Sequence, residues 1–498
     1  MSVRLCPDSA EFLSHASPNF PGMGAGMLGS QTWTLGDEIT EQVVAEIVRR
    51  AGNGYDRWTE QVEHTGYCTK PIRLVGRSEE VDIATGEVRI AYDTRSEPDN
   101  SLLIACGDRR GSRCPSCAAR YRGDAYQIVA SGLGGGKGLP ETVADHPSLF
   151  VTFTAPSFGA VHAHKTKGHQ AQPCRPRRSG KCRHGIPLAC WQKHDKDDPR
   201  VGQPLCARCF DYEGQILWNA HAPELWRRTT IAIRRALAQQ TGVTTREIDK
   251  VVRVSYFRVA EYQRRGALHF HVVMRLDGYC KEPGHFPAPP EEFASEVLEA
   301  AVRHSGETAW APCLTATGER AHVRWGEQLE VRVIDGTAEL GPQSVSAYIA
   351  KYSTKSIDAT ASLEREGDGH QGRLVAAVRK LAHLPELRHL KLDRAVDSIG
   401  YKGHWSSKSR RYSTTFRALR HARRVHVKRK NSPQGVPLDS WGRPEDDGQV
   451  FTRRTWRFVG CGYRTSGEAL LAMSAAARAR DNKRLALEEL RSLRRSDP

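Results

Sequence analysis

The sequence predicts a mixed α+β protein with more than one domain. Two strand-like runs joined by a tight turn occupy residues 250–262 and 267–276, and segments with apolar residues at helical spacing lie on both sides of them. Cysteines cluster between Cys68 and Cys209, a pattern that indicates metal-binding modules. Because 498 residues are more than a domain with a single hydrophobic core usually contains, we expect two or three domains.

The elements that precede this hairpin follow from local patterns. The Gly- and Pro-rich start of the chain runs into EQVVAEIVRRA, so residues 1–60 are expected to form a tail and a short helix. Alternating side chains in PSLFVTFTA predict a strand over residues 147–155. Apolar residues at helical spacing then predict a helix over residues 213–240.

The hairpin turn is the strongest local signal in the chain. QRRG separates the two strand-like runs, and Gly266 is free to adopt a positive φ. The segments after it are predicted, in order, as a loop over residues 278–292, a helix over 293–304, a strand pair around 322–334, a helix from Pro342 through Lys355, and a last helix over 467–494.

The second strand of the hairpin, ALHFHVVMR, carries two histidines. Alternate side chains of a strand share a face, so His269 and His271 are expected side by side, as suits a divalent ion. The alternative is a half-buried strand that happens to contain two histidines. A three-residue loop would place Glu261 opposite His269 as third ligand for Mg²⁺ or Mn²⁺, with open positions for phosphate oxygens. A two-residue loop would place it opposite Leu268, as a surface glutamate.

A downstream segment, SVSAYIAKYSTKS, gathers phenols and ammonium groups. On a helix, one face carries the four side chains Tyr348, Lys351, Tyr352 and Lys355. Tyrosine is a weak nucleophile at its ordinary pKa, but nearby cations and a metal-polarised phosphate favour attack by the phenolate. The alternative is an amphipathic helix with tyrosines packed at its edge.

The cysteine pattern contains two C-x₂-C pairs, each able to supply two thiolates to zinc. The first pair is predicted to form one structural Zn²⁺ site, with the ligands Cys68, Cys106, Cys114 and Cys117. The second pair is predicted to form another, with the ligands Cys182, Cys190, Cys206 and Cys209. Other residues near the second pair are alternative ligands, namely His184, His194 and Cys174, and a redox-active pair is the alternative to zinc. The remaining cysteines look solitary: Cys6, Cys280, Cys313 and Cys461.

Charge predicts a nucleic-acid partner. The chain has 74 Lys and Arg against 57 Asp and Glu, a formal charge of +17. Residues 402–430 contain eleven Lys and Arg and no acid. This run, with Trp405, Tyr412 and Phe416, predicts phosphate contacts and base stacking, and its expected DNA-binding residues are Arg410, Arg411, Arg420, Arg423 and Arg424. The alternative is a solvated basic helix.

Targeting signals are not evident. No stretch approaches the roughly eighteen apolar residues of a membrane span. The first residues, MSVRLCPDSAEFLSH, lack the basic and then apolar plan of a signal peptide. We therefore expect a cytoplasmic protein, without a membrane partner and without a disulfide framework.

The motifs resemble, in order, the three motifs of the HUH endonuclease superfamily. FVTFTAP, HFHVV and YIAKYSTK occur in that sequence, and the phrases EYQRRGALHFHVVMRLDG, CGDRRGSRCPSCAARYRGDAY and PLCARCFDY are similar to those of rolling-circle replication initiators of actinomycete plasmids and integrative elements. The two tyrosines four residues apart also look like those of small isometric phage initiators. The resemblance covers roughly residues 65–475.

This resemblance implies a site-specific nickase. His269 and His271 would bind a metal ion that polarises the scissile phosphate, while Tyr348 or Tyr352 attacks and leaves a 5′-phosphotyrosyl bond and a free 3′-OH. Family members with one tyrosine keep it at the Tyr352 position, and Lys351 or Lys355 would steady the phosphate. The implied partners are single-stranded origin DNA and the host replication helicase and polymerase.

The implied fold is a central antiparallel sheet flanked by helices. We expect four regions: a tail and helix (1–60), a cysteine-rich module (61–145), an HUH domain with a zinc insert at about 174–212 (146–360), and a basic helical DNA-binding region (361–498). More than a hundred residues separate the first two motifs, which departs from the family pattern. Alternative functions are a transposase or conjugative relaxase with the same chemistry, or a non-catalytic zinc-containing regulator.

Overall fold

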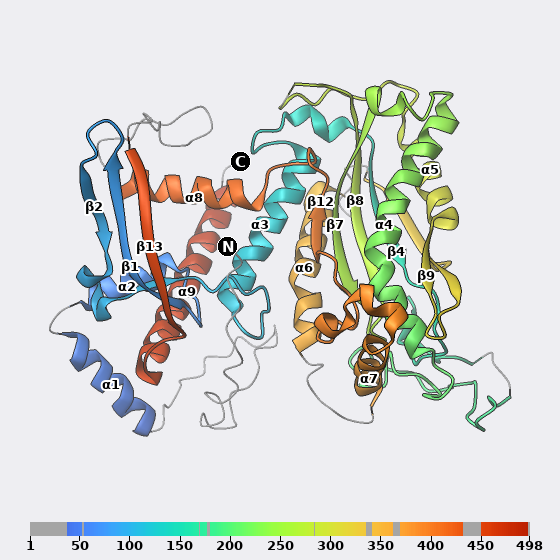
Figure 1. Ribbon diagram of the computed structural model, residues 1–498, viewed down its shortest axis with the longest axis horizontal. Helices are drawn as coiled ribbons and strands as arrows, with labels where there is room; N and C mark the ends of the chain where they lie inside the picture. The colour runs from blue at the N-terminus through green and yellow to red at the C-terminus, as the bar shows by residue number, and fades with distance from the viewer. Residues whose placement is uncertain are drawn as a thin grey trace. The chain divides into compact units, whose positions relative to one another are not determined.

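The structure is a computed structural model that divides the chain into two compact units (Figure 1). Unit 1 comprises residues 1–108, 113–117 and 437–498, and unit 2 comprises residues 109–112 and 118–436. The residues that the structure describes are 37–51, 54–168, 170–176, 180–282, 284–334, 341–361, 369–431 and 450–496. Each unit is an α+β arrangement with an antiparallel sheet, as the sequence predicts.

Unit 1 is built on a sheet whose strands come from both ends of the chain. The strand order is β13-β1-β2, and β3 pairs with part of β1. The strands are β1 (Ile72–Asp82), β2 (Val88–Asp93), β3 (Leu102–Ile104) and β13 (Val450–Cys461). Its helices are α1 (Asp37–Ala51), α2 (Tyr55–His64) and α9 (Ser466–Ser496). Strand β13 and helix α9 therefore belong to the same fold as β1, rather than to a separate basic region.

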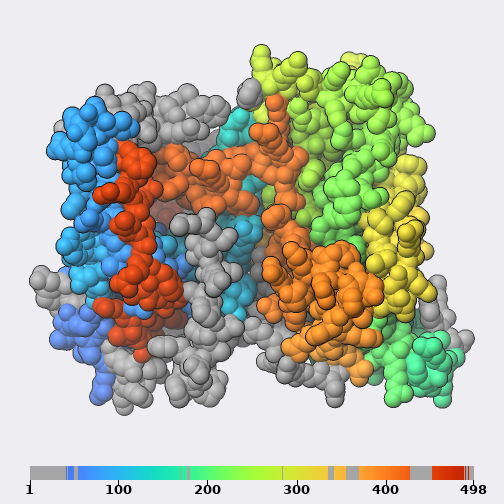
Figure 2. Space-filling view, viewed as in Figure 1, coloured from blue at the N-terminus to red at the C-terminus, as the bar shows by residue number. Residues whose placement is uncertain are grey.

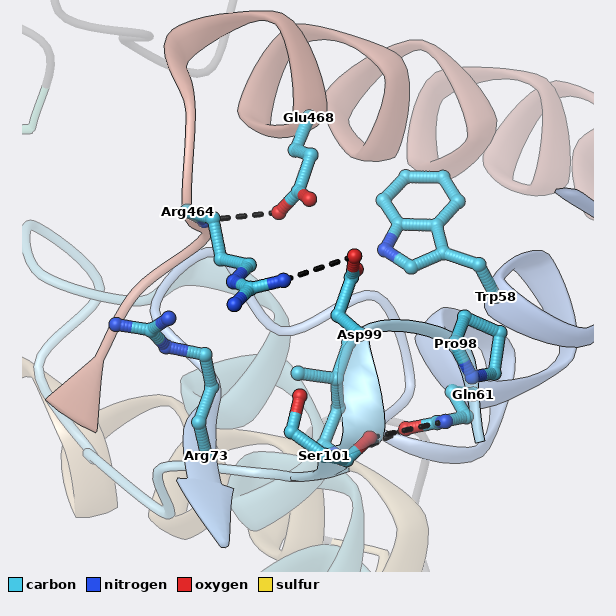
Figure 3. Close-up of a pocket in the computed structure, with 9 residues that line it drawn as sticks. Trp58, Gln61, Arg73, Pro98, Asp99, Ser101, Arg464 and Glu468 are labelled. Carbon is cyan, nitrogen blue, oxygen red and sulfur yellow. Dashed lines mark hydrogen bonds and ion pairs between the residues drawn. The ribbon is translucent and has the colours of Figure 1, made fainter. Parts of the chain in front are cut away.

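Residues that line a small polar pocket in unit 1 hold the start of α9 in place (Figure 3). Arg464 Nη1 lies 2.8 Å from Asp99 Oδ1, and the Arg464 backbone amide donates to Glu468 Oε2 at 2.8 Å. Beside them, Trp58 and Tyr463 pack in the small apolar core. Ion pairs and apolar packing together hold α9 to the N-terminal part of the unit.

Unit 2 is organised by a five-stranded antiparallel sheet with the order β11-β4-β8-β7-β12. The strands are β4 (Ser148–Thr154), β7 (Val252–Tyr262), β8 (Leu268–Gly278), β11 (Leu329–Val333) and β12 (Ser406–Lys408). The predicted strand at 147–155 and the predicted hairpin are confirmed. Strand β8 is central, because it pairs with β4 on one side and β7 on the other.

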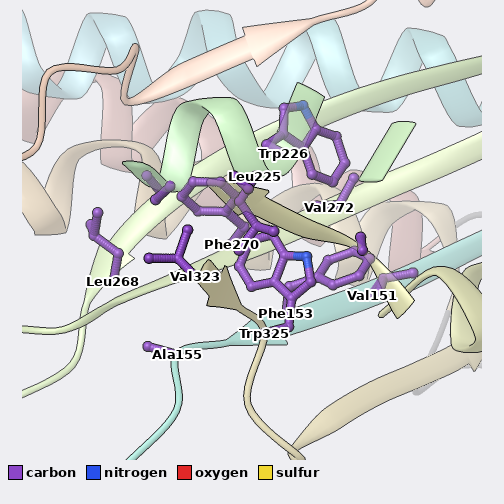
Figure 4. Close-up of a cluster of buried hydrophobic side chains, with 14 of the residues drawn as sticks. Val151, Phe153, Ala155, Leu225, Trp226, Leu268, Phe270, Val272, Val323 and Trp325 are labelled. Carbon is purple, nitrogen blue, oxygen red and sulfur yellow. The ribbon is translucent and has the colours of Figure 1, made fainter. Parts of the chain in front are cut away.

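One face of this sheet packs against α4 (Tyr212–Thr241), the predicted helix at 213–240. Asp211 caps the start of α4 by accepting from the Gly214 amide, and Gly242 ends it in a left-handed conformation. The interface is aromatic: Phe153, Trp226 and Trp325 pack with Phe270, as Figure 4 shows. Side chains of this size bury extensive apolar area and hold β4 and β8 in place.

The other face of the sheet carries α6 (Pro342–Ala361) and α3 (Pro115–Gly134). In Figure 1, α6 and α4 lie on opposite sides of the strands. Val345 and Ile349 of α6 are buried against Phe257, Val259 and Val273 of the sheet. This packing fixes which face of α6 is turned toward β8.

The remaining elements include one departure from prediction. The runs within 322–334 do not pair with each other, because β10 (Arg320–Arg324) pairs with β9 (Trp310–Leu314) while β11 joins the main sheet beside β4. The other elements of unit 2 are α5 (Ser295–Thr308), α7 (His370–Ala382), α8 (Phe416–Asn431), β5 (Lys165–Lys167) and β6 (Gln170–Gln172). None of the helices in the described residues combines the length and apolar character needed to cross a membrane.

Candidate functional site

The hairpin turn selects the register that brings a carboxylate to the histidine face. Glu261 of β7 pairs with His269 of β8, which is the three-residue register. Gly266 has φ +79°, and the Gln263 amide donates to the Ala267 carbonyl at 2.8 Å. A side chain at position 266 would disfavour this conformation, so the glycine allows the turn that sets the register.

Three ligand atoms converge above β7 and β8. Glu261 Oε2 lies 3.0 Å from His271 Nε2 and 3.4 Å from His269 Nε2. Thr152 Oγ1 of β4 lies 3.2 Å from Nδ1 of His271, the ring nitrogen that faces away from the carboxylate. Imidazole lone pairs and a carboxylate repel at such separations unless a proton or a cation lies between them. The donor set therefore fits a divalent ion.

Burial keeps His271 in the form that a metal requires. The pKa of His271 is lowered mainly by burial and also by the positive charge of His269, although the hydrogen bond to Glu261 acts in the opposite direction. A lowered pKa leaves the imidazole neutral at pH 7. A neutral imidazole is the form that coordinates a cation.

Both tyrosines of α6 pack against this histidine. The His271 ring centroid lies 5.3 Å from that of Tyr348 and 5.1 Å from that of Tyr352, and the two phenol rings are 4.5 Å apart. Phe150 of β4 packs edge-on against Tyr348 at 5.4 Å. The structure thus brings the predicted histidines, carboxylate and tyrosines into one cluster, with Tyr348 40% exposed.

Tyr348 is protonated at neutral pH. Burial is the first cause of a raised pKa at Tyr348, followed by its hydrogen bond with Tyr352 and by the Glu261 and Glu330 carboxylates. Any attack by this oxygen would require loss of its proton and positive charge near the phenolate.

Of the two lysines in the tyrosine segment, Lys351 and Lys355, the structure describes the side chain of Lys351. Lys351 Nζ lies 5.9 Å from the centre of the Tyr352 ring, close enough to favour negative charge there. Lys355 lies one turn farther along α6, and its side chain is outside the described part of the structure.

The first cysteine group assembles as predicted in unit 1. The sulfurs of Cys68, Cys106, Cys114 and Cys117 lie within 4.8 Å of one another, and three of these residues are buried. The Cys106 amide donates to Cys68 Sγ at 3.3 Å, an interaction that favours a thiolate. The group could hold a metal ion such as zinc.

The insert between β4 and α4 contains two groups rather than one. Cys182, Cys206 and Cys209 meet with His184, whereas Cys190 meets with His162, Cys174 and His194. The predicted set of Cys182, Cys190, Cys206 and Cys209 is therefore not brought together, because the Cys190 backbone pairs with Arg175, beside Cys174. The Cys190 and His194 spacing was a signal of this second group, and His162 was missed.

The four cysteines that were expected to be solitary do not all have the same state. Cys280 and Cys313 are free thiols, as expected, while Cys6 lies outside the described residues. Cys461 at the end of β13 is disulfide-bonded, so it is not the solitary thiol that was expected.

The basic segment is folded more tightly than the sequence indicated. Tyr412 is fully buried, Trp405 packs against Tyr262, and Phe416 stacks on Tyr121 at 4.7 Å, so these rings serve packing rather than an open stacking surface. Three of the five predicted arginines have protein partners: Arg423 pairs with Asp124, Arg411 donates to the Cys280 and Lys281 carbonyls, and Arg420 donates to the Phe416 carbonyl. Arg411 is half-buried, whereas Arg410, Arg420, Arg423 and Arg424 are exposed.

Comparison with known proteins gives a consistent result. A family model described as RepSA, replication initiator protein, pSAM2, matches residues 54–477. A replication initiator protein of Streptomyces ambofaciens is 38% identical over 459 residues, which are 88% of this chain and 93% of that protein. No solved structure matches the chain. Since both matches extend through most of the chain, it belongs to the RepSA family of replication initiator proteins.

Proposed function

We propose that this replication initiator nicks one DNA strand at its origin by tyrosine attack, as an HUH-type endonuclease does. The observation that carries the proposal is the packing of both Tyr348 and Tyr352 against His271, which shares Glu261 with His269. The rings of both candidate nucleophiles thus lie 5.1–5.3 Å from the ring of a histidine that would bind the metal ion. Such proximity is the main requirement for phosphoryl transfer.

The reaction is a transesterification. The tyrosine oxygen forms a bond to phosphorus, and the bond from phosphorus to the 3′ oxygen breaks. The phenol loses its proton, the departing 3′ oxygen gains one, and the products are a 5′-phosphotyrosyl bond and a free 3′-OH. The energy of the phosphodiester is kept in the new bond, so the same site can later rejoin or transfer the strand.

The residues around the phosphate take distinct roles. His269, His271 and Glu261 would hold the Mg²⁺ or Mn²⁺ ion, which supplies Lewis-acid polarisation of the phosphate when bound. Thr152 orients the His271 ring through Nδ1. Lys351, and Lys355 one turn later, would offset charge on the phosphate or the phenolate.

The two tyrosines allow two cleavages without exchange of protein. In our proposal Tyr352 attacks first, and Tyr348, whose ring is 4.5 Å away, acts when the replicated strand is released. Their nearly equal distances from His271 support use of one metal site by both.

The rest of the chain would hold DNA and the fold. We assign structural Zn²⁺ to the Cys68 group in unit 1 and to the Cys182, His184, Cys206 and Cys209 group in the insert. Exposed Arg410, Arg420 and Arg424 would contact phosphate, whereas Arg411 and Arg423 bond to the Cys280 carbonyl and to Asp124 and help to hold the segment in place. The free 3′-OH would be used by a host polymerase after strand opening by a host helicase.

A covalent adduct tests the proposal. The purified chain is incubated with single-stranded origin DNA and Mn²⁺, and products are separated on a denaturing gel. We expect a DNA–protein adduct that is lost in the double variant Tyr348→Phe with Tyr352→Phe, while Tyr279→Phe retains it. An adduct that persists in the double variant would rule out these nucleophiles.

Metal dependence is tested in the same assay. We expect His269→Ala with His271→Ala to abolish the adduct, whereas His304→Ala, on the exposed side of α5, leaves it unchanged. Equal adduct yields from both variants would reject the metal site. DNA binding without adduct in wild-type protein would favour a non-catalytic regulator.

A further inference from the structure

The insert between β4 and α4 has almost no apolar core of its own. Across the described residues from 157 to 209, Cys174 is the sole buried side chain among the hydrophobic types. Strands β5 and β6 have three residues each and are mostly exposed, and the insert reaches the surface of unit 2 (green-teal, Figure 2). A segment of this kind needs another source of stability, and a bound metal is a common one.

A complete set of four metal ligands lies inside this insert, separate from the Cys182 group. His162 Nδ1 lies 3.0 Å from His194 Nε2, and Cys190 Sγ lies 3.4 Å from the same nitrogen. Cys174 is fully buried and completes a group whose ligand atoms lie within 4.8 Å of one another. Two thiolates and two imidazoles form one of the usual tetrahedral zinc sets.

Outer contacts prepare these ligands for a cation. His194 is fully buried, and its Nδ1 lies 2.8 Å from Asp198 Oδ2, which itself pairs with Arg200. A carboxylate there fixes the proton on Nδ1 and directs the Nε2 lone pair into the group, as is usual for zinc-bound histidine. The Ala163 amide donates to Cys174 Sγ at 3.2 Å, which favours the thiolate.

The same ligands are tied to the turn between β7 and β8. The Gly202 amide donates to the His162 carbonyl at 2.8 Å, and a Cβ at Gly202 would lie only 2.6 Å from the Arg264 carbonyl carbon. Arg264 in turn donates to the Asp198 carbonyl at 3.1 Å. Two residues that bond to ligands of the group, Asp198 and Gly202, therefore lie against Arg264. Arg264 is three residues beyond Glu261.

We propose that His162, Cys174, Cys190 and His194 bind a further structural zinc ion, which holds the insert against the β7–β8 turn. The inference does not require the nicking reaction. Zinc content and amide hydrogen exchange test the zinc site even where no DNA adduct forms. Failure of this inference can therefore be distinguished from failure of the proposed function.

Metal counting is the first test. The full chain is purified in the His269→Ala, His271→Ala background, so that the Glu261 group contributes no ion, and zinc is measured by mass spectrometry. We expect three zinc ions per chain, one for each of the three cysteine-containing groups found among the described residues. Cys174→Ser with Cys190→Ser should lower the count to two, while Cys280→Ser with Cys313→Ser keeps three. Unchanged zinc in the first pair would overturn the site.

A substitution that preserves the ion covers the case in which the serine variant does not fold. His162→Cys replaces an imidazole ligand by a thiolate and should keep three ions. In cobalt-substituted protein it should raise the thiolate-to-cobalt charge-transfer absorbance by the increment of one thiolate. An unchanged spectrum would place His162 outside the site.

Hydrogen exchange tests the link to the turn. We expect faster amide exchange over residues 263–267 in the Cys174→Ser, Cys190→Ser variant than in the Cys280→Ser, Cys313→Ser control. Arg264→Ala should also speed exchange there but keep all three zinc ions. Loss of zinc without any change in exchange at the turn would overturn the positioning role.

Discussion

At the scale of single residues, the chemistry depends on which nitrogen of His271 faces Glu261. Thr152 Oγ1 lies 3.2 Å from Nδ1, and Glu261 Oε2 lies 3.0 Å from Nε2. The threonine therefore orients the ring and leaves Nε2 for the metal. Sequence reasoning singled out Glu261 but not Thr152, which is only one of several alternating residues in its strand.

Thr152→Val removes this hydrogen bond and keeps the shape of the side chain. We expect metal affinity and adduct formation to fall by about 10–100-fold, the usual effect of losing an outer partner of a metal ligand. Thr154→Val is the matched control, because Thr154 lies opposite His269 and its hydroxyl makes no hydrogen bond within the described residues. Titration with Mn²⁺ measures the difference, and equal affinities in the two variants would contradict the orienting role.

At the scale of elements, the β7–β8 hairpin places the site. The sequence was sufficient to predict both strands, the turn and the shared face of His269 and His271, since all depend on local alternation and on Gly266. It left the register open between Leu268 and His269, because a two-residue and a three-residue loop are both compatible with QRRG. The turn hydrogen bonds decide for the three-residue form.

Gly266→Ala tests this element. A Cβ there would lie 2.7 Å from Leu374 Cδ1, at φ +79°. We expect destabilisation of about 2–4 kcal/mol, from a left-handed conformation and from overpacking, and weaker metal binding as Glu261 shifts. Gly242→Ala has a similar φ of +71° with open space around it, so it should cost only about 1–2 kcal/mol. Chemical denaturation compares them, and equal losses would contradict the packing argument.

The grouping of cysteines and the edges of the sheet could not be predicted at this scale. Cys182 and Cys190 are close in sequence, yet they belong to different groups because the backbone of the insert pairs Arg175 with Cys190. Strands β11 and β12 join the sheet beside strands distant in sequence. Such pairings depend on long-range packing, which local patterns do not encode.

At the scale of the whole molecule, unit 1 is built from segments that lie far apart in the sequence. β13 returns to pair with β1 along its whole length, so unit 1 contains both ends of the described chain. Composition suggested instead a basic C-terminal region at 361–498. The basic residues of this stretch lie in both units, since α8 belongs to unit 2 and β13 with α9 belongs to unit 1.

A buried polar network sets how unit 2 responds to acid. Asp277 accepts from Arg275 Nε at 2.6 Å and lies 2.9 Å from His146 Nδ1. Burial alone would raise the pKa of Asp277, but the hydrogen bonds with His146 and Arg275 outweigh it, and the pKa is lowered. A carboxylate with a lowered folded-state pKa stabilises the fold above its unfolded-state pKa of about 4, and this contribution is lost as pH falls through the folded-state value.

We expect the free energy of unfolding of unit 2 to decline below about pH 4. Asp277→Asn should cost about 3–5 kcal/mol at pH 7, because it leaves buried Arg275 without its counter-charge, and should weaken the decline in acid. Asp393→Asn, at an exposed carboxylate, should change neither quantity. Urea unfolding at pH 7 and pH 3 followed by tryptophan fluorescence measures both, and identical pH profiles in all three proteins would contradict the network.

The assignment of tyrosine chemistry to α6 is tested most directly by locating the DNA on the protein. The chain is reacted with single-stranded origin DNA and Mn²⁺, digested with protease and nuclease, and the peptides are sequenced by mass spectrometry. We expect a phosphonucleotide on Tyr352, and on Tyr348 when Tyr352→Phe is used. A remnant on any residue outside α6, or cleaved DNA with a free 5′-phosphate and no modified peptide, would contradict the proposed mechanism.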